Sequence, residues 1–336
     1  LMEEAAAKAP ALAEPAAAVY SKRAASLLEN GDYSLAEKYC RLAIALAPEN
    51  IWYPIYLGEA LQKQGQDTEA IDLYIKGINS DPESVYIANL IHGSGDTVGQ
   101  INIWRSIVEN HPDAFLPKLY LTRACYEGGE YERAVAAADE AGQNDNQELM
   151  LYRCGSLLHL DKLEDGIACL SVLAQTNPDM GPAVGMAYST RAQKAYTTGD
   201  FLLAERLYRN AMLAAPNDLW HTIHLAETLE KLERNVEALT LYTQVLVVAK
   251  DAPRTAAMLD ALLLRAFDMK RRVSVWSEIC KQIPDTAQPL LYLGKAFEQA
   301  GNRDSAVESY RGALRIDDTL EEAQAGLARL EKLEKD

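Results

Sequence analysis

The stretch YLGKAFEQAGNRDSAVESYRGALRIDD, residues 292–318, has a near copy at residues 56–82, YLGEALQKQGQDTEAIDLYIKGINSDP. Both begin with Tyr-Leu-Gly, and each then places a second glycine, an alanine and a tyrosine at the same intervals. Self-similarity of this kind indicates a repeat architecture, and it changes how every other motif in the chain is interpreted.

A frame of 34 residues accommodates both copies and puts small residues at fixed positions. Position 8 of the frame is Gly58 or Gly294, position 15 is Gly65 or Gly301, and position 20 is alanine. A glycine at position 15 ends one helix and turns the chain into the next. Small residues at positions 8 and 20 let two antiparallel helices approach, and a proline near position 32 ends the second helix. The frame therefore predicts a series of helix pairs.

The frame recurs along most of the chain, with strong and weak copies. Residues 85–114 have a first helix about one turn short, residues 149–184 are irregular, and residues 253–286 have lost the small residues. We expect an Ala/Pro-rich linker or leading helix at 1–16, a repeat array at 17–320 and a capping helix at 321–336. The nine expected repeats are 17–50, 51–84, 85–114, 115–148, 149–184, 185–218, 219–252, 253–286 and 287–320.

This period and these key positions resemble the tetratricopeptide repeat. The resemblance covers residues 17–320. It implies an all-α fold, a right-handed α-solenoid of about nine helix–turn–helix repeats with a C-terminal capping helix. It also implies that the first helices of the repeats line a concave groove, in which positions 2, 5, 6, 9, 12 and 13 face a ligand.

Composition limits the classes of partner. The chain has 33 basic and 49 acidic residues, a net charge of -16. Such a charge disfavours nucleic acid and anionic membrane surfaces. No apolar run approaches the roughly 18 residues of a membrane span, so we expect no membrane insertion.

The five cysteines have neither CxxC nor zinc-site spacing. We therefore expect buried, unpaired thiols, which favour a reducing compartment. A cytoplasmic location follows from this expectation. The alternative is a periplasmic or envelope-associated protein whose signal precedes residue 1.

The groove positions implied by the resemblance are rich in aromatic and charged residues. Position 5 never carries the lysine, and position 6 never the asparagine, that some arrays of this family use for ligand recognition. The aromatic residues either anchor a partner or simply pack between repeats. The expected partner-binding residues are Trp52, Tyr56, Glu59, Tyr120, Arg123, Tyr126, Tyr196, Trp220, His224, Glu227, Tyr292 and Lys295.

These residues favour a non-enzymatic scaffold that binds a peptide or partner segment carrying basic and apolar side chains. No nucleophile–base constellation is recognisable, and we expect no cofactor and no metal. Two alternatives remain open. One is an accessory region of a larger glycosyltransferase- or methyltransferase-type enzyme, and the other is a bacterial envelope assembly factor.

The degenerate repeat at 253–286 carries Asp260 at position 8 and Arg272 at position 20. These positions face each other across a helix pair, so the frame predicts a structural ion pair inside the repeat. A shifted register that leaves both side chains in water is the alternative.

His221, His224 and Glu227 share part of one helix face. A metal site would need a further ligand, and none is evident nearby. The alternative interpretation is two surface histidines on either side of the buried Leu225.

Overall fold

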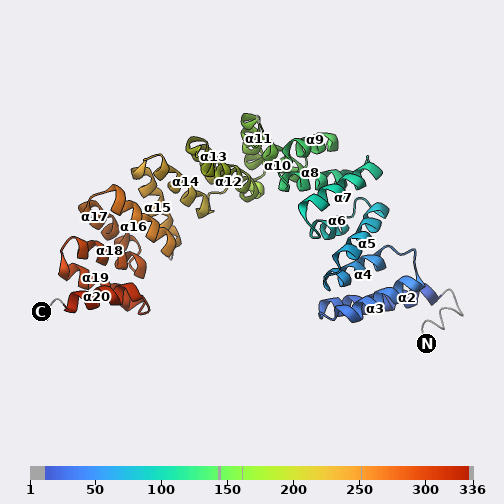
Figure 1. Cartoon of the computed structure of the whole chain (residues 1–336), viewed down its shortest axis with the longest axis horizontal. Helices are drawn as coiled ribbons and strands as arrows, with labels where there is room; N and C mark the ends of the chain where they lie inside the picture. Colours follow the sequence, from blue (N-terminus) through green and yellow to red (C-terminus); the bar gives the residue numbers. More distant parts are fainter. Residues whose placement is uncertain (1–11, 143–144, 161, 251, 333–336) are drawn as a thin grey trace. The chain divides into compact units, whose positions relative to one another are not determined.

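The computed structural model describes residues 12–142, 145–160, 162–250 and 252–332, and every regular element within these ranges is helical. Figure 1 follows these helices from α2, in blue, to α20, in red. They form two compact units, Leu1–Leu173 and Ala174–Asp336, called unit 1 and unit 2 below. The all-α fold predicted from the sequence is confirmed over the described residues.

Unit 1 is built from consecutive helices joined by short turns, and most helices pack against the next along the chain. The first member of each pair is called the first helix below. The helices are α2 (Ala13–Glu29), α3 (Tyr33–Leu46), α4 (Trp52–Gln62), α5 (Asp67–Ser80), α6 (Val85–His92), α7 (Thr97–Asn110), α8 (Phe115–Glu127), α9 (Tyr131–Ala141), α10 (Gln147–Leu157) and α11 (Leu163–Thr176), the last of which ends in unit 2.

Unit 2 repeats the same arrangement after a single 3-10 turn, η2 (Pro178–Met180). Its helices are α12 (Gly181–Thr197), α13 (Phe201–Ala214), α14 (Leu219–Lys231), α15 (Asn235–Ala249), α16 (Pro253–Ala266), α17 (Met269–Gln282), α18 (Ala287–Gln299), α19 (Arg303–Ile316) and α20 (Glu321–Lys332).

The turn inside most helix pairs depends on a glycine at position 15 of the frame. Gly65 and Gly301 adopt φ values of 77° and 73°, in the left-handed region that glycine occupies without steric cost. The repeat at 219–252 has Glu233 at this position, and Glu233 takes a φ of 59°. One turn of unit 2 therefore places a residue with a side chain in a conformation that such residues rarely adopt.

The two similar stretches of sequence have the same interior contact. A Cβ atom on Gly58 would lie 2.6 Å from Cε1 of Tyr74, and one on Gly294 would lie 2.7 Å from Cε1 of Tyr310. Tyr310 is fully buried, and its hydroxyl donates a hydrogen bond to Oε2 of Glu298 at 2.6 Å. The glycine at position 8 thus makes room for the tyrosine ring of the second helix.

Two helices begin away from the regular frame. Helix α6 has 8 residues against 11 in α4, because it begins only at Val85. Helix α12 begins at Gly181, ahead of the repeat start expected at 185. The leading segment expected at 1–16 lies outside the described residues except for Leu12 and the first turn of α2, and residues 333–336 of the expected capping helix lie outside them too.

Among the described residues, no helix is both long enough and apolar enough to cross a membrane.

Candidate functional site: the exposed side of the first helices

Four successive first helices of unit 1 each carry a tyrosine. We call these four residues, one each from α4, α6, α8 and α10, the tyrosine row. Its members are Tyr56, Tyr86, Tyr120 and Tyr152.

Two members of the row were not among the predicted site residues. Tyr86 lies nine residues before Gly95, the same interval that separates Tyr56 from Gly65, so counting back from the turn glycine would have found it. Tyr152 has no turn glycine after it, and the frame could not place it.

Trp52, Tyr86 and Glu59 form a cluster on α4 and α6, called the Trp52 cluster below. The Trp52 and Tyr86 rings have centroids 6.1 Å apart, and 37 % and 45 % of these residues is exposed. The Tyr86 hydroxyl donates to Oε1 of Glu59 at 2.5 Å. Burial raises the pKa of the Glu59 carboxyl, while the bond from Tyr86 opposes that shift. Two large rings and a carboxylate are therefore held together at the surface.

Tyr120 is placed differently from the other expected anchors. It is only 7 % exposed, its ring lies 4.9 Å from that of Trp104, and its hydroxyl donates to Oδ1 of Asn89 at 2.6 Å. Tyr126 is half-buried and packs on the Tyr152 ring, with centroids 5.5 Å apart. Both rings fill space between repeats, the alternative role that the sequence had left open.

Arg123 is paired within unit 1. Its Nε donates to Oε1 of Glu127 at 2.9 Å, and its Nη1 lies 3.7 Å from Oε1 of Glu148. The guanidinium carbon is 5.9 Å from the centroid of the Tyr152 ring. A partner would have to compete with these interactions to engage Arg123.

In unit 2, the exposed ring is Trp220, on α14. It is 53 % exposed and stacks on His224, with centroids 6.0 Å apart. Nδ1 of His224 lies 2.7 Å from Oε2 of Glu227. The guanidinium carbon of Arg254, from α16, is 5.8 Å from the centroid of Trp220. A cation of the same unit therefore already occupies this ring face.

A pocket of about 460 Å³ lies on the first helices α12, α14 and α16 of unit 2. At this pocket Glu230 accepts a hydrogen bond from the Tyr242 hydroxyl at 2.6 Å and pairs with Arg265. The pocket combines an apolar wall with charged side chains, of which Glu230 and Arg265 pair with each other. Its lining residues are Tyr196, Glu227, Glu230, Lys231, Met258, Ala261 and Arg265.

Tyr292 and Lys295 of α18 are also satisfied within unit 2. Tyr292 is 9 % exposed and stacks on Trp276, with centroids 5.0 Å apart. Nζ of Lys295 lies 4.7 Å from the centroid of Tyr292 and forms an ion pair with Glu322.

The side chains of Asp260 and Arg272 pair inside unit 2. Nε and Nη2 of Arg272 donate to the two carboxylate oxygens of Asp260, at 2.9 and 2.8 Å. The indole N–H of Trp276 donates to the same carboxylate at 2.9 Å, and Arg272 also donates to Gln299. The pair is almost fully buried, with Arg272 1 % and Asp260 5 % exposed. It replaces the small residues that bring helices together in other repeats.

The interpretation of two surface histidines is wrong for His221. This residue is 2 % exposed, and its Nδ1 lies 2.7 Å from Oγ of Ser189, because α14 turns it toward α12 rather than toward solvent. Its Nε2 lies 3.5 Å from Oδ2 of Asp218. Within the described ranges, no group of three or more His, Cys, Asp or Glu residues is arranged to hold a metal ion.

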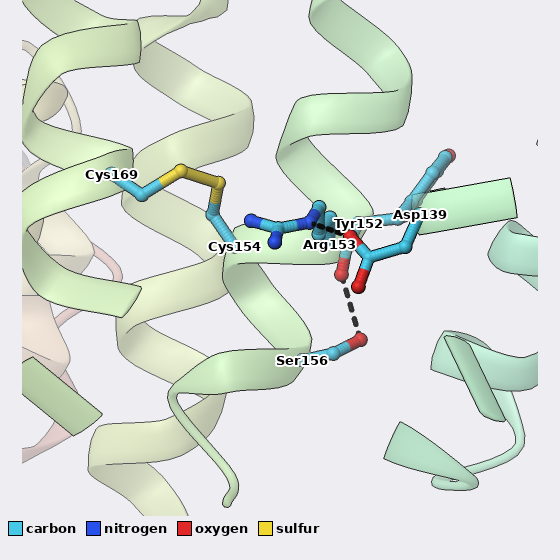
Figure 2. The surroundings of a disulfide bond; sticks show 6 residues. All are labelled: Asp139, Tyr152, Arg153, Cys154, Ser156 and Cys169. Atoms are coloured by element: carbon cyan, nitrogen blue, oxygen red, sulfur yellow. Dashed lines mark hydrogen bonds and ion pairs between the residues drawn. A yellow bond between two sulfur atoms is a disulfide. The ribbon is translucent and has the colours of Figure 1, made fainter. Parts of the chain in front are cut away.

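The expectation that all five cysteines are unpaired is wrong for two of them. Cys154 of α10 and Cys169 of α11 form a disulfide, shown in Figure 2 beside the Arg153–Asp139 ion pair. Their Cα atoms are 5.8 Å apart, because adjacent helices bring residues of separation 15 together. Spacing along the chain could not reveal this proximity, and the inference from unpaired thiols to a reducing compartment loses its premise.

The comparisons with known proteins agree with the repeat geometry. Two family models described as tetratricopeptide repeat match the chain, one at residues 27–91 and the other at residues 222–256 and 290–324. The chain carries tetratricopeptide repeats. Its helix pairs are those of an α-solenoid, as the resemblance implied.

The chain is also similar to solved structures of other proteins, with low sequence identities and low TM-scores. Yeast Tom70 has 12 % identity and a TM-score of 0.36, with 96 % of this chain and 82 % of that chain covered. A tetratricopeptide repeat protein from Parabacteroides merdae has 13 % identity and a TM-score of 0.40, with coverages of 94 % and 99 %. Naa15/Naa10 bound to HypK-THB has 14 % identity and a TM-score of 0.37, with coverages of 98 % and 62 %. No curated protein matches this chain.

Proposed function

We propose that this chain is a protein-interaction scaffold whose unit 1 binds a segment of a partner protein on the exposed side of its first helices. Tetratricopeptide repeats generally present their first helices as binding surfaces. The observation that carries the proposal is the Trp52 cluster, where two large rings remain substantially exposed on adjacent first helices. Exposed aromatic rings of this kind supply most of the binding energy in protein interfaces.

The anchoring residues within this proposal are Trp52, Tyr56 and Tyr86. Tyr120 and Tyr126 are not anchors in this proposal, because both rings pack between helices. Trp220 and the pocket on α12, α14 and α16 form a second, more polar surface in unit 2. The partner segment carries apolar side chains for the rings and a basic one for the Glu59 carboxylate.

The test begins with peptides selected from a random display library on the immobilised full chain. Their dissociation constants are then measured for the parent and for Tyr56→Ala and Tyr86→Ala. We expect affinity to weaken at least about tenfold, since an interface anchor contributes roughly 2 kcal/mol or more. Val98→Ala is the matched control, because Val98 is 67 % exposed on the second helix α7.

Each variant is also melted, so that loss of fold is recognised. Peptides that bind both tyrosine variants as tightly as the parent would remove the site from the first helices. An equal loss for Val98→Ala would move the site toward the second helices.

A further inference from the structure

Cations of this chain lie over aromatic rings at three places on the first helices. Arg123 lies over Tyr152, Arg254 over Trp220 and Lys295 over Tyr292, at 5.9, 5.8 and 4.7 Å from the ring centroids. Such placements are attractive because the ring face carries negative charge density, most strongly in tryptophan. The chain therefore places its own cations over aromatic rings at three sites.

The Trp52 cluster has the same framework without the cation. Trp52 and Trp220 both occupy position 2 of the frame, and Glu59 and Glu227 both occupy position 9. Among the described residues, no Lys or Arg lies over Trp52 or Tyr86, and none forms an ion pair with Glu59. Lys63, one turn along α4, acts on Glu59 only at longer range.

The residue that follows each tryptophan by 34 positions explains why the cation is missing. In unit 2 this residue is Arg254, in the first turn of α16, and its guanidinium lies over Trp220. After Trp52 the same interval leads to Tyr86, whose ring lies beside that of Trp52. An uncharged ring therefore stands in this repeat where unit 2 has a cation.

We propose that Trp52, Tyr86 and Glu59 bind the guanidinium group of an arginine supplied by the partner segment. The inference deepens the proposed function, on which it rests for the source of that arginine. The guanidinium lies against the rings of Trp52 and Tyr86, as that of Arg254 lies over Trp220. The Glu59 carboxylate accepts charge-assisted hydrogen bonds from the guanidinium. Tyr86 holds the carboxylate through its hydroxyl and contributes the second ring.

The test uses the full chain labelled with ¹⁵N at its four tryptophans. N-acetyl-arginine methylamide is titrated while the indole N–H signals are recorded, and the neutral citrulline analogue is titrated in parallel. We expect the Trp52 signal to shift saturably with the arginine compound alone. Trp104 and Trp276 are fully buried and serve as internal references. Trp220 stays unshifted in the parent because Arg254 already covers it.

Two variants sharpen the result. Glu59→Gln is expected to weaken binding of the arginine compound about fivefold, the effect of removing one unit charge at contact distance near water. Arg254→Gln removes the cation from the Trp220 ring, so the indole signal of Trp220 should then shift when the arginine compound is added. The inference would be overturned if the Trp52 indole signal did not shift, or if it shifted equally with the citrulline analogue. It would also be overturned if the Trp220 signal responded equally in the parent and in Arg254→Gln.

The two proposals can fail separately. If the affinity of the selected peptides depends on Tyr56 and Tyr86 while the Trp52 signal does not shift with the arginine compound, only the arginine inference is lost. If Trp52 responds but no selected peptide depends on the first helices, only the proposed scaffold site is lost.

Discussion

The first helices of the two units carry similar residues at the same frame positions, yet those residues are available to different degrees. Trp52 and Trp220 are both at position 2 and both exposed, but only Trp220 has a cation of its own unit over the ring. The difference originates in the next repeat, where the residue 34 positions on is Arg254 after Trp220 and Tyr86 after Trp52. A single residue of a neighbouring helix thus decides whether a cation lies over the aromatic ring.

Two helix pairs also differ in the contact that joins their helices. In unit 1, Gly58 lets the Tyr74 ring pack directly against its helix. In unit 2, the repeat at 253–286 uses the Asp260–Arg272 pair at the positions where other repeats have small residues. One helix pair is held by apolar contact and the other by a buried, fully hydrogen-bonded charge pair, so the two should respond differently to truncation.

The largest effect is expected from breaking the buried pair. Asp260→Ala should lower the free energy of unfolding of unit 2 by about 3–5 kcal/mol, because it leaves the Arg272 charge buried without its partner. Arg311→Ala is the matched control, since the Arg311–Glu331 pair is exposed and worth about 0–1 kcal/mol. Denaturant titrations of the full chain give both values.

The double variant Asp260→Gly with Arg272→Ala restores the residue types of the regular repeats. It should lose much less stability than the sum of the two single variants, because no lone charge remains. Additive losses would show that the pair contributes through packing rather than through its charges.

Loss of the disulfide should rank next. Replacing Cys154 with serine opens the cross-link between α10 and α11, whose cysteines are separated by 15 residues. A loop of that length corresponds to about 3 kcal/mol of stability in the chain-entropy description. Hydrogen exchange should quicken in α10 and α11 while α18 and α19 keep their protection. Equal quickening in both units would contradict a local effect.

The sequence predicted the helix pairs well because the positions that define them act locally. A glycine that permits a left-handed turn and a small residue that admits a tyrosine ring require only their own repeat. The Asp260–Arg272 contact followed from the same reasoning, since its two positions face each other within one pair.

The candidate site was harder to predict because it depends on neighbouring repeats. The aromatic content of the first helices was evident, but the frame could not show that Tyr120 is buried against Trp104. It also missed Tyr86, since the shortened repeat had been excluded from the count of groove positions. Nor did cysteine spacing reveal the disulfide between α10 and α11, which depends on helix packing.

A smaller and stabilising effect is expected at the turn between α14 and α15, where the non-glycine residue Glu233 takes a positive φ at position 15. Glu233→Gly should raise the free energy of unfolding by about 1 kcal/mol, because glycine adopts the φ of 59° without the cost that a Cβ atom adds. The converse change, Gly199→Ala, should lower it by a similar amount, since Gly199 has a φ of 84°. Thermal melts of both variants test the comparison, and a destabilised Glu233→Gly would contradict it.

The smallest effect concerns the pH dependence of arginine recognition by the Trp52 cluster. Burial raises the pKa of Glu59 above its ordinary value, so this carboxylate takes up a proton at a higher pH than an exposed glutamate. Binding of the guanidinium requires the ionised form. Affinity for N-acetyl-arginine methylamide should therefore be full above the raised pKa and fall about fivefold as the pH drops through it.

Other groups around Glu59 do not titrate in this range. Tyr86 of α6, Tyr74 of α5 and Cys40 of α3 face it, and burial raises the pKa of each, so all three stay protonated in acid. The Glu59→Gln variant should accordingly bind the arginine compound with an affinity that does not change over the same pH interval. If parent and variant weakened in parallel, the titrating group would lie elsewhere, and Glu59 would serve only to position Tyr86.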